Sequence, residues 1–494
     1  MQWAQTTFAE RRKVLKTMLK FVLENQETIA RVACLDSGKT MVDAALGEIL
    51  VTTEKLRWTI RHGEESLRNE RRETNLLMMY KWNEVMYQPL GVVAALVSWN
   101  YPFHNLVSPI IASIFAGNAI VVKGSESTAW SSSYFASIAT RALEACGHSA
   151  DIIQSVICWP DVAEHLTSHP DISHITFIGS RPVAHHVCAS AAKSLTPVCV
   201  ELGGKDPAIV LDDLSHSDFK RVASILMRGT FQSAGQNCIG IERVIALPTV
   251  HDRLVDYLTP EIRALRPGSV LTTSPDTPID VGALISSASF ATLEALIDDA
   301  VKHGARLLAG GKRYAHPDHP AGHYFTPTFL SNVTPSMKIA QQELFAPVFL
   351  LMRAETVDDA IAIANSTLYA LGSSVYGSST ADLEKVVREV HAGMVAVNDF
   401  AVTYMVQLPF GGAKGSGYGR FAGKEGLRSL CNVKAVTRDR WPGVKTAIPP
   451  PMDIPLKGGG AGEKAWRMAQ GIVWLGYAPD LRGKLVGLRG VLGL

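Results

Sequence analysis

The chain has 494 residues, more than a single hydrophobic core usually holds, which predicts two or three domains. Apolar residues make up 47% and charged residues 19%, the profile of a well-packed soluble enzyme. The net charge of +2 gives no electrostatic reason to expect a nucleic-acid partner. Seven scattered cysteines, without a CxxC pair or metal-ligand spacing, indicate reduced thiols, a cytoplasmic protein and no metal site.

The predicted elements begin with an amphipathic helix at 8–23, and neither a signal peptide nor a membrane-length apolar stretch is recognisable. From about residue 91, strand-like and helix-like segments alternate, which predicts a parallel α/β sheet. A helix at 214–229 then leads into a second α/β set that extends to about residue 400. The strands of the first set are continuous apolar runs, typical of burial on both faces, at 91–97, 118–123, 175–178 and 198–200.

Three further segments lie outside these two sets. Residues 73–88 predict a two-stranded excursion with a polar turn at 82–84. Residues 442–462 are rich in Pro and Gly and predict a linker. The tail at 465–494 mixes Trp and Leu with Arg and Lys, so it either lies in a membrane interface or packs on its own protein or a partner subunit. Gly and Pro interrupt its helical pattern, which favours packing.

One cysteine stands in the most informative stretch, FQSAGQNC at 231–238. Cys238 follows a Gly-Gln turn, where backbone N–H groups can favour the thiolate that a nucleophile needs. Glu201 begins ELGGK at the end of an apolar strand, where α/β ligand sites gather and where partial burial raises the pKa of a general base. Singly, Cys238 is also typical of an inert core thiol and Glu201 of a solvated strand end. Their combination predicts a nucleophile and a base.

Polar residues at three other strand ends fit the same chemistry. Asn100 in SWNYP offers an amide that can hold a developing oxyanion, although the same stretch also favours a plain turn. Lys123 and Glu126 can hold ribose hydroxyls, and a carboxylate there repels a 2′-phosphate, which favours NAD over NADP. Gly179 and Ser180, between a strand and a helix, predict a phosphate contact.

Together these motifs closely resemble the aldehyde dehydrogenase superfamily in order and spacing, from the first helix to about residue 440. The resemblance implies an α/β protein with a Rossmann-type cofactor domain, an α/β catalytic domain and a small β oligomerisation excursion. The stretches that carry it are SWNYP at 98–102, KGSE at 123–126, FIGS at 177–180, ELGGK at 201–205, GQNC at 235–238, ELFAP at 343–347 and PFGGAKGSGYGR at 409–420.

The resemblance also implies the domain boundaries and the partners. Residues 1–204 would bind NAD, with oligomerisation strands at 70–90, and residues 205–426 would form the catalytic domain. Strands paired across subunits imply a homodimer or homotetramer. A fungal and plant branch of the superfamily has an apolar tail and is associated with the secretory-pathway membrane, which implies peripheral contact with the endoplasmic reticulum membrane. The remaining segments are an oligomerisation strand at 427–440, a linker at 441–462 and an apolar basic tail at 463–494.

By the same resemblance, Cys238 attacks the aldehyde carbon to form a thiohemiacetal, and hydride passes to NAD. Glu201 then activates the water that hydrolyses the thioester to a carboxylic acid. Asn100 and the backbone N–H of Cys238 hold the oxyanion. The other implied roles are pyrophosphate contacts from Trp99, Gly179 and Ser180, adenosine-ribose contacts from Lys123 and Glu126, nicotinamide-site contacts from Glu343 and Phe345, and tunnel walls from Tyr101 and Phe410.

The sequence departs from the family pattern at several positions. Pro109 and Phe421 stand where family members often have a Lys and a Glu that are assigned to proton relay, so that relay is absent or rebuilt. Ala184 and Ala346 replace two family glycines. The family also has roughly fifty or more residues before the first helix, so we expect either a truncated gene model or a shortened, less stable form.

Two alternatives to a general NAD-dependent aldehyde dehydrogenase stay open. One is a semialdehyde or aminoaldehyde dehydrogenase, although no predicted tunnel residue carries an obvious charge and Tyr101, Phe103 and Phe410 favour an apolar tunnel. The other is a non-catalytic, membrane-associated scaffold. The short N-terminus and the altered relay favour a scaffold, whereas the intact Cys238 and Glu201 argue against it.

Overall fold

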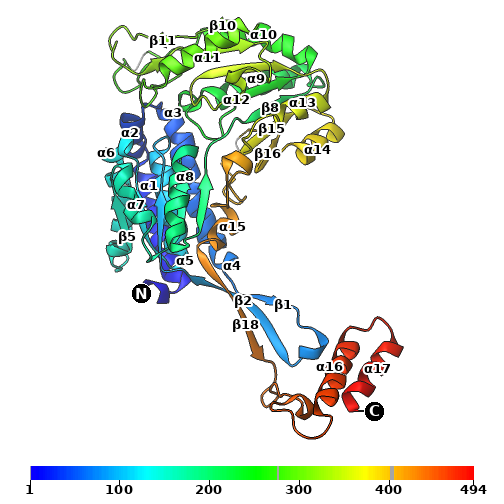
Figure 1. Cartoon of the computed structure of the whole chain (residues 1–494). Coiled ribbons are helices and arrows are strands. Elements are labelled where there is room, and N and C mark those ends of the chain that lie inside the picture. Colours follow the sequence, from blue (N-terminus) through cyan, green and yellow to red (C-terminus); the bar gives the residue numbers. More distant parts are fainter. Residues whose placement is uncertain (1, 275–276, 401–404, 494) are drawn as a thin grey trace. The chain divides into compact units, whose positions relative to one another are not determined.

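The computed structural model of the chain forms two compact units (Figure 1). Residues 2–274, 277–400 and 405–493 are described. The first unit comprises Met1–Leu67 and Pro89–Asn432, and the second comprises Arg68–Gln88 and Val433–Leu494.

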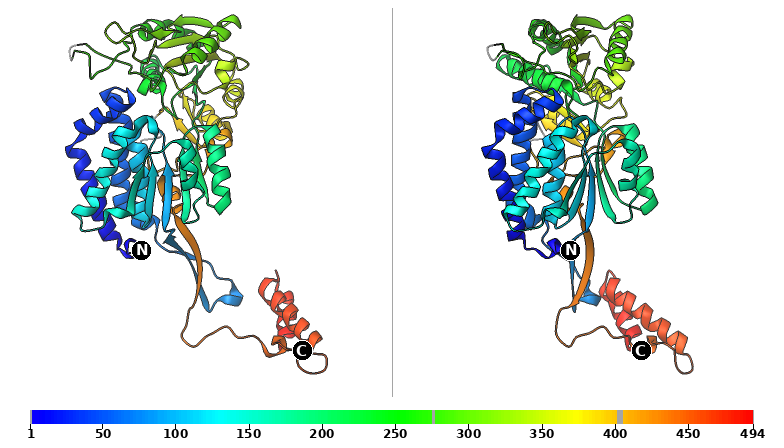
Figure 2. Two further views of the ribbon diagram at one scale, coloured as in Figure 1. Left: turned by 60° about the vertical axis from the view of Figure 1, so that its left-hand side comes forward. Right: turned by 90° about the vertical axis from the view of Figure 1, so that its left-hand side faces the viewer.

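A six-stranded sheet in the first unit has the strand order β17-β7-β6-β3-β4-β5. Strands β3 to β7 pair in parallel, and β17 runs antiparallel to β7. Apolar side chains on both faces explain why helices cover both sides of this sheet. Figure 2 shows the blue N-terminal helices on one side and the green α7 and α8 on the other. The strands are β3 (Val92–Leu96), β4 (Ala119–Lys123), β5 (Ile153–Val156), β6 (Ile172–Ile178), β7 (Val198–Glu201) and β17 (Gly417–Tyr418).

A seven-stranded sheet in the same unit has the order β10-β13-β14-β9-β8-β15-β16, with β10 as an antiparallel edge. A large apolar cluster is built around this sheet and the helices that cover it. The predicted α/β fold with two parallel sets is therefore confirmed. The strands are β8 (Pro207–Val210), β9 (Arg243–Ala246), β10 (Arg306–Ala309), β13 (Thr328–Ser331), β14 (Val348–Arg353), β15 (Gly372–Tyr376) and β16 (Met394–Val397).

The helices of the first unit follow the predicted amphipathic segments. The first, α1 (Phe8–Glu24), begins with a capping box in which Thr7 and Glu10 bind each other's backbone N–H groups. A π-helical turn, η2 (Ala45–Leu50), joins α3 (Met41–Ala44) to α4 (Val51–Ser66). The other helices are α2 (Gln26–Ser37), α5 (Pro102–Ala116), α6 (Ala129–Ala145), α7 (Pro160–Thr167), α8 (Arg181–Ala191), α9 (His216–Phe231), α10 (Pro248–Arg263), α11 (Phe290–Lys302), α12 (Lys338–Gln341), α13 (Val357–Ala364), α14 (Thr380–Glu389) and α15 (Gly423–Arg428).

The second unit contains a three-stranded sheet with the order β1-β2-β18. The polar turn that the sequence predicted at 82–84 is wrong, because these residues lie inside β2 (Lys81–Pro89) and pair with β1 (Glu70–Arg72). The connection is instead the segment 73–80, where Asn75 caps a short 3-10 turn by accepting from Met78 N–H. The third strand, β18, spans Cys431–Asp439.

Two helices at the end of the second unit form a hairpin, α16 (Ala461–Tyr477) and α17 (Leu481–Leu492). The sequence predicted that glycines interrupt the helical pattern of this tail, but they lie inside both helices. They allow the two helix backbones to pack closely. A Cβ added at Gly487 would lie 2.2 Å from the backbone nitrogen of Leu475, and one added at Gly471 would lie 2.6 Å from that of Val491. Among the described residues, no helix is both long enough and apolar enough to cross a membrane.

Candidate active site

Four predicted site residues lie at one edge of the six-stranded sheet. Lys123 ends β4 and Glu201 ends β7. Gly179 directly follows β6, and Trp99 lies in the loop after β3. The register places these ends together: Leu96 pairs with both Lys123 and Phe177, and Ile178 pairs with Glu201. The carboxyl ends of parallel strands are where α/β proteins bind their ligands, so the topology itself gathers these residues.

The loop that carries Cys238 has a strained backbone. After α9 ends at Phe231, Ser233 and Ala234 take left-handed φ values of 53° and 56°, followed by Gly235 at 74°. A Cβ at Gly235 would lie 2.1 Å from the carbonyl oxygen of Ala346, so only glycine fits there. Strain of this kind persists where the surrounding structure fixes the loop, and it is common at functional sites.

Cys238 and the buried Glu201 line the same cavity, and the thiol lies close enough to the carboxylate to affect its pKa. Burial raises the pKa of Glu201 to about 7, and the nearby thiol of Cys238 offsets part of that rise. Burial and the nearby charge of Glu201 raise the pKa of Cys238 well above its ordinary value. The expectation that the loop favours the thiolate is therefore wrong for this state, and the thiol must lose its proton to a base.

Asn100 is held in place from three directions. Its Nδ2 donates to the carbonyl oxygen of Gln236 at 3.1 Å, which ties the amide to the loop two residues before Cys238. Its Oδ1 accepts from Ser98 Oγ at 2.7 Å and from Asn105 Nδ2 at 3.3 Å. An amide carries two N–H groups, so a second donor remains for an oxyanion after the bond to Gln236.

A buried ion pair that sequence reasoning missed supports Asn100 from below. Lys39 Nζ lies 2.6 Å from Glu48 Oε1 and donates to the carbonyl oxygen of Asn100 at 2.7 Å. The other oxygen of Glu48 accepts from the N–H groups of Phe103 and His104, in the first turn of α5. Glu48 lies in the π-helical turn η2, a feature that is frequent at functional sites.

The predicted cofactor contacts also lie near this edge. Lys123 Nζ binds Glu126 Oε2 at 2.7 Å, and the rings of Trp99 and Phe345 meet edge to face with centroids 5.6 Å apart. Glu343 accepts from the N–H of Gly204 at 3.1 Å, and burial raises its pKa. Ser180 is the N-cap residue of α8, where backbone N–H groups point outward, as predicted for a phosphate contact.

These residues fit a dinucleotide. A Cβ at Gly203 would lie 2.1 Å from Glu343 Oε1, so the chain keeps glycine where this carboxylate approaches the backbone. Glu201 Oε1 is buried and has no hydrogen-bond partner among the described groups, which leaves an acceptor between the Cys238 loop and the strand edge. The Lys123–Glu126 pair, a helix N-terminus without a side-chain cap and an open acceptor are groups of the kinds that such a cofactor and its reaction require.

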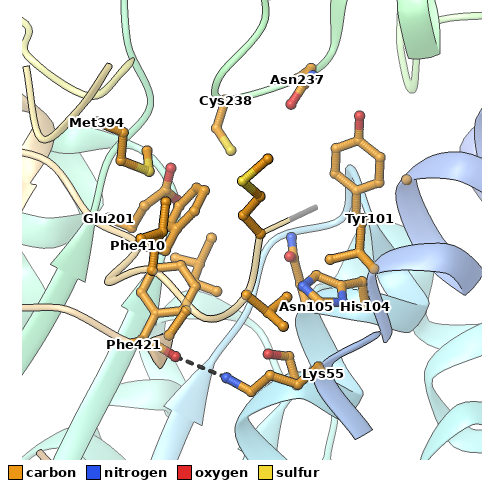
Figure 3. A pocket seen from close by; sticks show the side chains of 18 of the residues that line it. Lys55, Tyr101, His104, Asn105, Glu201, Asn237, Cys238, Met394, Phe410 and Phe421 are labelled. Carbon is orange, nitrogen blue, oxygen red and sulfur yellow. Dashed lines mark hydrogen bonds between the residues drawn. The ribbon is translucent and has the colours of Figure 1, made fainter. Parts of the chain in front are cut away.

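A cavity of about 70 Å³ lies between Cys238 and helices α4 and α5. Figure 3 shows Cys238 on one side of this cavity, with Glu201, Phe410 and Tyr101 around it. Tyr101 and Phe410 thus lie in the wall, where the sequence placed them. Phe103 does not line the cavity, because its ring is fully buried against Phe135 at 5.1 Å between centroids.

One charged group in the cavity wall was missed: Lys55, on α4. The interpretation that no tunnel residue is charged is therefore wrong. Its Nζ donates to the backbone oxygen of Phe421 at 3.1 Å, and the ring of Phe421 packs against Phe410. A signal existed in the sequence, since Lys55 lies four residues after Val51 and four before Thr59 on a buried helix face.

Comparison with known proteins identifies the class. The model of the aldehyde dehydrogenase family matches residues 1–436, so the chain belongs to the aldehyde dehydrogenase family. It is also similar to an aldehyde dehydrogenase-like protein of Schizosaccharomyces pombe, with 51% identity over 97% of this chain and 91% of that protein.

Further similar proteins have names that specify a substrate or a cofactor. A succinate-semialdehyde dehydrogenase [NADP(+)] of Mycobacterium avium is 31% identical over 87% of this chain and 88% of its own length. The solved structure of a Mycobacterium tuberculosis aldehyde dehydrogenase complexed with NAD+ has a TM-score of 0.81 at 29% identity, covering 90% of this chain and 88% of that one. The Staphylococcus aureus betaine aldehyde dehydrogenase, also in complex with NAD+, has a TM-score of 0.81 at 27% identity, covering 90% and 87%. The name of the first of these proteins includes NADP(+), whereas the two solved structures contain NAD+. By its family, the chain is an oxidoreductase.

Proposed function

We propose that this protein oxidises an aldehyde to a carboxylic acid, with NAD as the cofactor and with Cys238 as the nucleophile. The observation that carries the proposal is the position of the Cys238 thiol beside the buried Glu201, in the wall of a largely apolar cavity. A nucleophile, an adjacent base and a water-excluding cavity are what acyl chemistry on a thiol requires.

The first step transfers a proton and forms a bond. Glu201 takes the thiol proton, and the Cys238 sulfur attacks the carbonyl carbon of the aldehyde, which gives a thiohemiacetal. Asn100 Nδ2 and the backbone N–H of Cys238 hold the oxyanion, and Lys39 and Glu48 keep Asn100 in position. The pKa of Glu201 near 7 suits a base that works at neutral pH.

The second step releases the product. Bound NAD would supply the hydride acceptor that converts the thiohemiacetal to a thioester on Cys238, and Glu343 and Phe345 would hold its nicotinamide half. Glu201 first releases the thiol proton to solvent and then removes a proton from a water molecule that attacks this thioester. The carbon–sulfur bond breaks, the carboxylic acid leaves, and Glu201 returns its proton to the sulfur so that the thiol re-forms. The low polarity of the cavity excludes other water until this step.

We assign the cofactor as NAD because Glu126 occupies the ribose-binding place beside Lys123. A carboxylate at this place repels the 2′-phosphate of NADP and accepts hydrogen bonds from the ribose hydroxyls of NAD. Trp99, Gly179 and Ser180 would line the pyrophosphate, and Glu343 and Phe345 would lie beside the nicotinamide half.

The test is a turnover assay with the purified protein, a panel of aldehydes and each dinucleotide, following the absorbance of the reduced cofactor. Aldehyde-dependent reduction of NAD that disappears in Cys238→Ala is the expected result. Binding of NAD without reduction for any aldehyde would overturn the proposal and favour the non-catalytic alternative. Equal use of NADP would overturn the assignment of Glu126.

We also propose a homo-oligomer, assembled through the sheet of the second unit. In that sheet β18 is an edge strand, and most of its side chains from Asn432 onward are exposed. An exposed strand edge is a template for pairing with a second copy. Sedimentation of the wild type as a dimer or tetramer, with Val433→Lys shifted toward the monomer, is expected; a monomeric wild type would refute this.

A peripheral membrane contact is proposed for the C-terminal hairpin. Because glycines fill the contact between α16 and α17, large apolar side chains point outward and are exposed, with basic residues between them. Vesicles with anionic lipid should bind the wild type more tightly than neutral vesicles do. The double variant Leu481→Glu/Leu485→Glu should no longer bind the anionic vesicles. Equal binding of this variant would refute the contact. The exposed apolar residues are Trp466, Val473, Trp474, Tyr477, Leu481, Leu485, Val486, Leu488 and Leu492.

A further inference from the structure

Among the residues that the structure describes, four lysines are buried, and three of them lie beside a carboxylate. Lys39 binds Glu48, Lys123 binds Glu126 and Lys205 binds Glu242, with Nζ to oxygen distances of 2.6, 2.7 and 2.6 Å respectively. This is the expected pattern, because a buried cation is costly unless an anion compensates it.

Lys55 is the exception within the described part of the chain. It is 4% exposed, and its Nζ donates to one neutral group, the backbone oxygen of Phe421. Burial alone lowers its pKa, to about 8, with no carboxylate charge opposing the shift, so the ammonium form still predominates at neutral pH. An ammonium group has three N–H donors, and a backbone oxygen neutralises no charge.

The position of Lys55 in the cavity wall indicates what kind of anion could compensate its charge. Figure 3 shows Lys55 and Cys238 on opposite sides of the cavity, with Asn105 and His104 nearer to Lys55. His104 contributes no second charge, because burial and the charge of Lys55 lower its pKa to about 3. The cavity volume of about 70 Å³ leaves room for a chain of a few heavy atoms.

We propose that Lys55 determines substrate specificity by binding a carboxylate at the far end of a short aldehyde whose carbonyl lies at Cys238. This inference rests on the proposed aldehyde oxidation, and it names the substrate class as a semialdehyde with an anionic tail. The substrate carboxylate would form an ion pair with Lys55, as Glu48 does with Lys39. An aminoaldehyde is excluded, because its ammonium tail would meet a like charge in a poorly solvated site.

The test compares three four-carbon aldehydes that differ at the tail: succinic semialdehyde, butanal and 4-aminobutanal. The variants are Lys55→Met and Lys55→Arg, with Lys16→Met, on the exposed face of α1, as a control for the same loss of charge. We expect the wild type to prefer succinic semialdehyde, and Lys55→Met to lose about 100-fold in kcat/KM for it. Butanal should change little in Lys55→Met, and Lys55→Arg should keep most of the preference.

A binding measurement separates this proposal from the proposed function. Cys238→Ala, which cannot form the thioester, is titrated with succinic semialdehyde and with butanal by calorimetry, with and without Lys55→Met. Tighter binding of the semialdehyde that requires Lys55 supports the subsite even if no aldehyde is oxidised. Oxidation with equal effects of Lys55→Met on all three aldehydes, or a preference of the wild type for butanal or 4-aminobutanal, would overturn the subsite and leave the proposed function intact.

Discussion

The two sides of the cavity bury opposite charges, and burial shifts both toward the neutral form. At the Cys238 side, burial raises the pKa of Glu201 to about 7. At the other side, burial lowers the pKa of Lys55 to about 8. The difference lies in the neighbours: Glu201 lies beside the thiol of Cys238, whereas Lys55 donates to the backbone oxygen of Phe421. The arrangement around Glu201 suits a base that gains and loses protons. The arrangement around Lys55 suits a cation that binds an anionic ligand.

The largest expected effect comes from removing the nucleophile. Cys238→Ala should lower kcat by roughly 10⁴-fold or more, since no other described side chain is placed to form the thioester. The measurement is steady-state reduction of NAD, with binding of NAD as the check that the fold is intact. Substantial residual turnover would mean that the chemistry does not pass through Cys238.

Removing the base should have the next largest effect. Glu201→Gln keeps the size of the side chain but cannot accept a proton, so kcat should fall by about 10³-fold. If Glu201 acts in hydrolysis, a covalent acyl-enzyme should accumulate, which mass spectrometry of the intact protein detects. A small fall in kcat without any adduct would assign the water-activating step to another group.

On the opposite side of the cavity, replacing Lys55 should change the free energy of unfolding. The folded-state pKa of Lys55, about 8, lies below the reference value of 10.5, so the folded chain disfavours the protonated form. This cost is fully present below pH 8 and disappears above about pH 10.5. At neutral pH, Lys55→Met should therefore be more stable than the wild type by on the order of 3 kcal/mol.

Denaturant unfolding near neutral pH and near the alkaline limit measures this difference, which should shrink as the pH rises from 8. A Lys55→Met variant that is less stable than the wild type at neutral pH would show that Lys55 already has a compensating anion. In that event the comparison between the two sides of the cavity would not hold.

The pH dependence should show the smallest effect and sharpen the role of Glu201. Its raised pKa means that the carboxylate form, which accepts protons, is lost as the pH falls below about 7. The rate should then fall about tenfold per pH unit below 7 and level off above it. The Glu201→Gln variant is the control, because its residual rate should not follow this curve. A wild-type rate that stays flat between pH 5 and 7 would contradict the base role.

The sequence alone was sufficient to predict the positions of the residues that lie in local motifs. The apolar strand runs predicted the parallel sheet, and strand ends then placed Glu201, Lys123 and Gly179 at one edge, because parallel strands end on the same side. The Gly-Gln turn before Cys238 also has a local cause, since Gly235 must adopt a left-handed backbone against Ala346. Family membership followed from the order of these motifs.

Other features were decided only by packing between segments far apart in the chain. Lys39 reaches Asn100, and Glu48 reaches the N–H groups at the start of α5, because η2 packs against α5, a contact that no local pattern encodes. The thiol pKa rises because the fold buries Cys238 beside Glu201, which reversed the expectation drawn from the loop. Lys55 is adjacent to no motif, and it becomes a site residue only because α4 turns that face toward the cavity. Strand ends and turn glycines can be read locally, whereas the solvation and the partner of a charge depend on the whole packed interior.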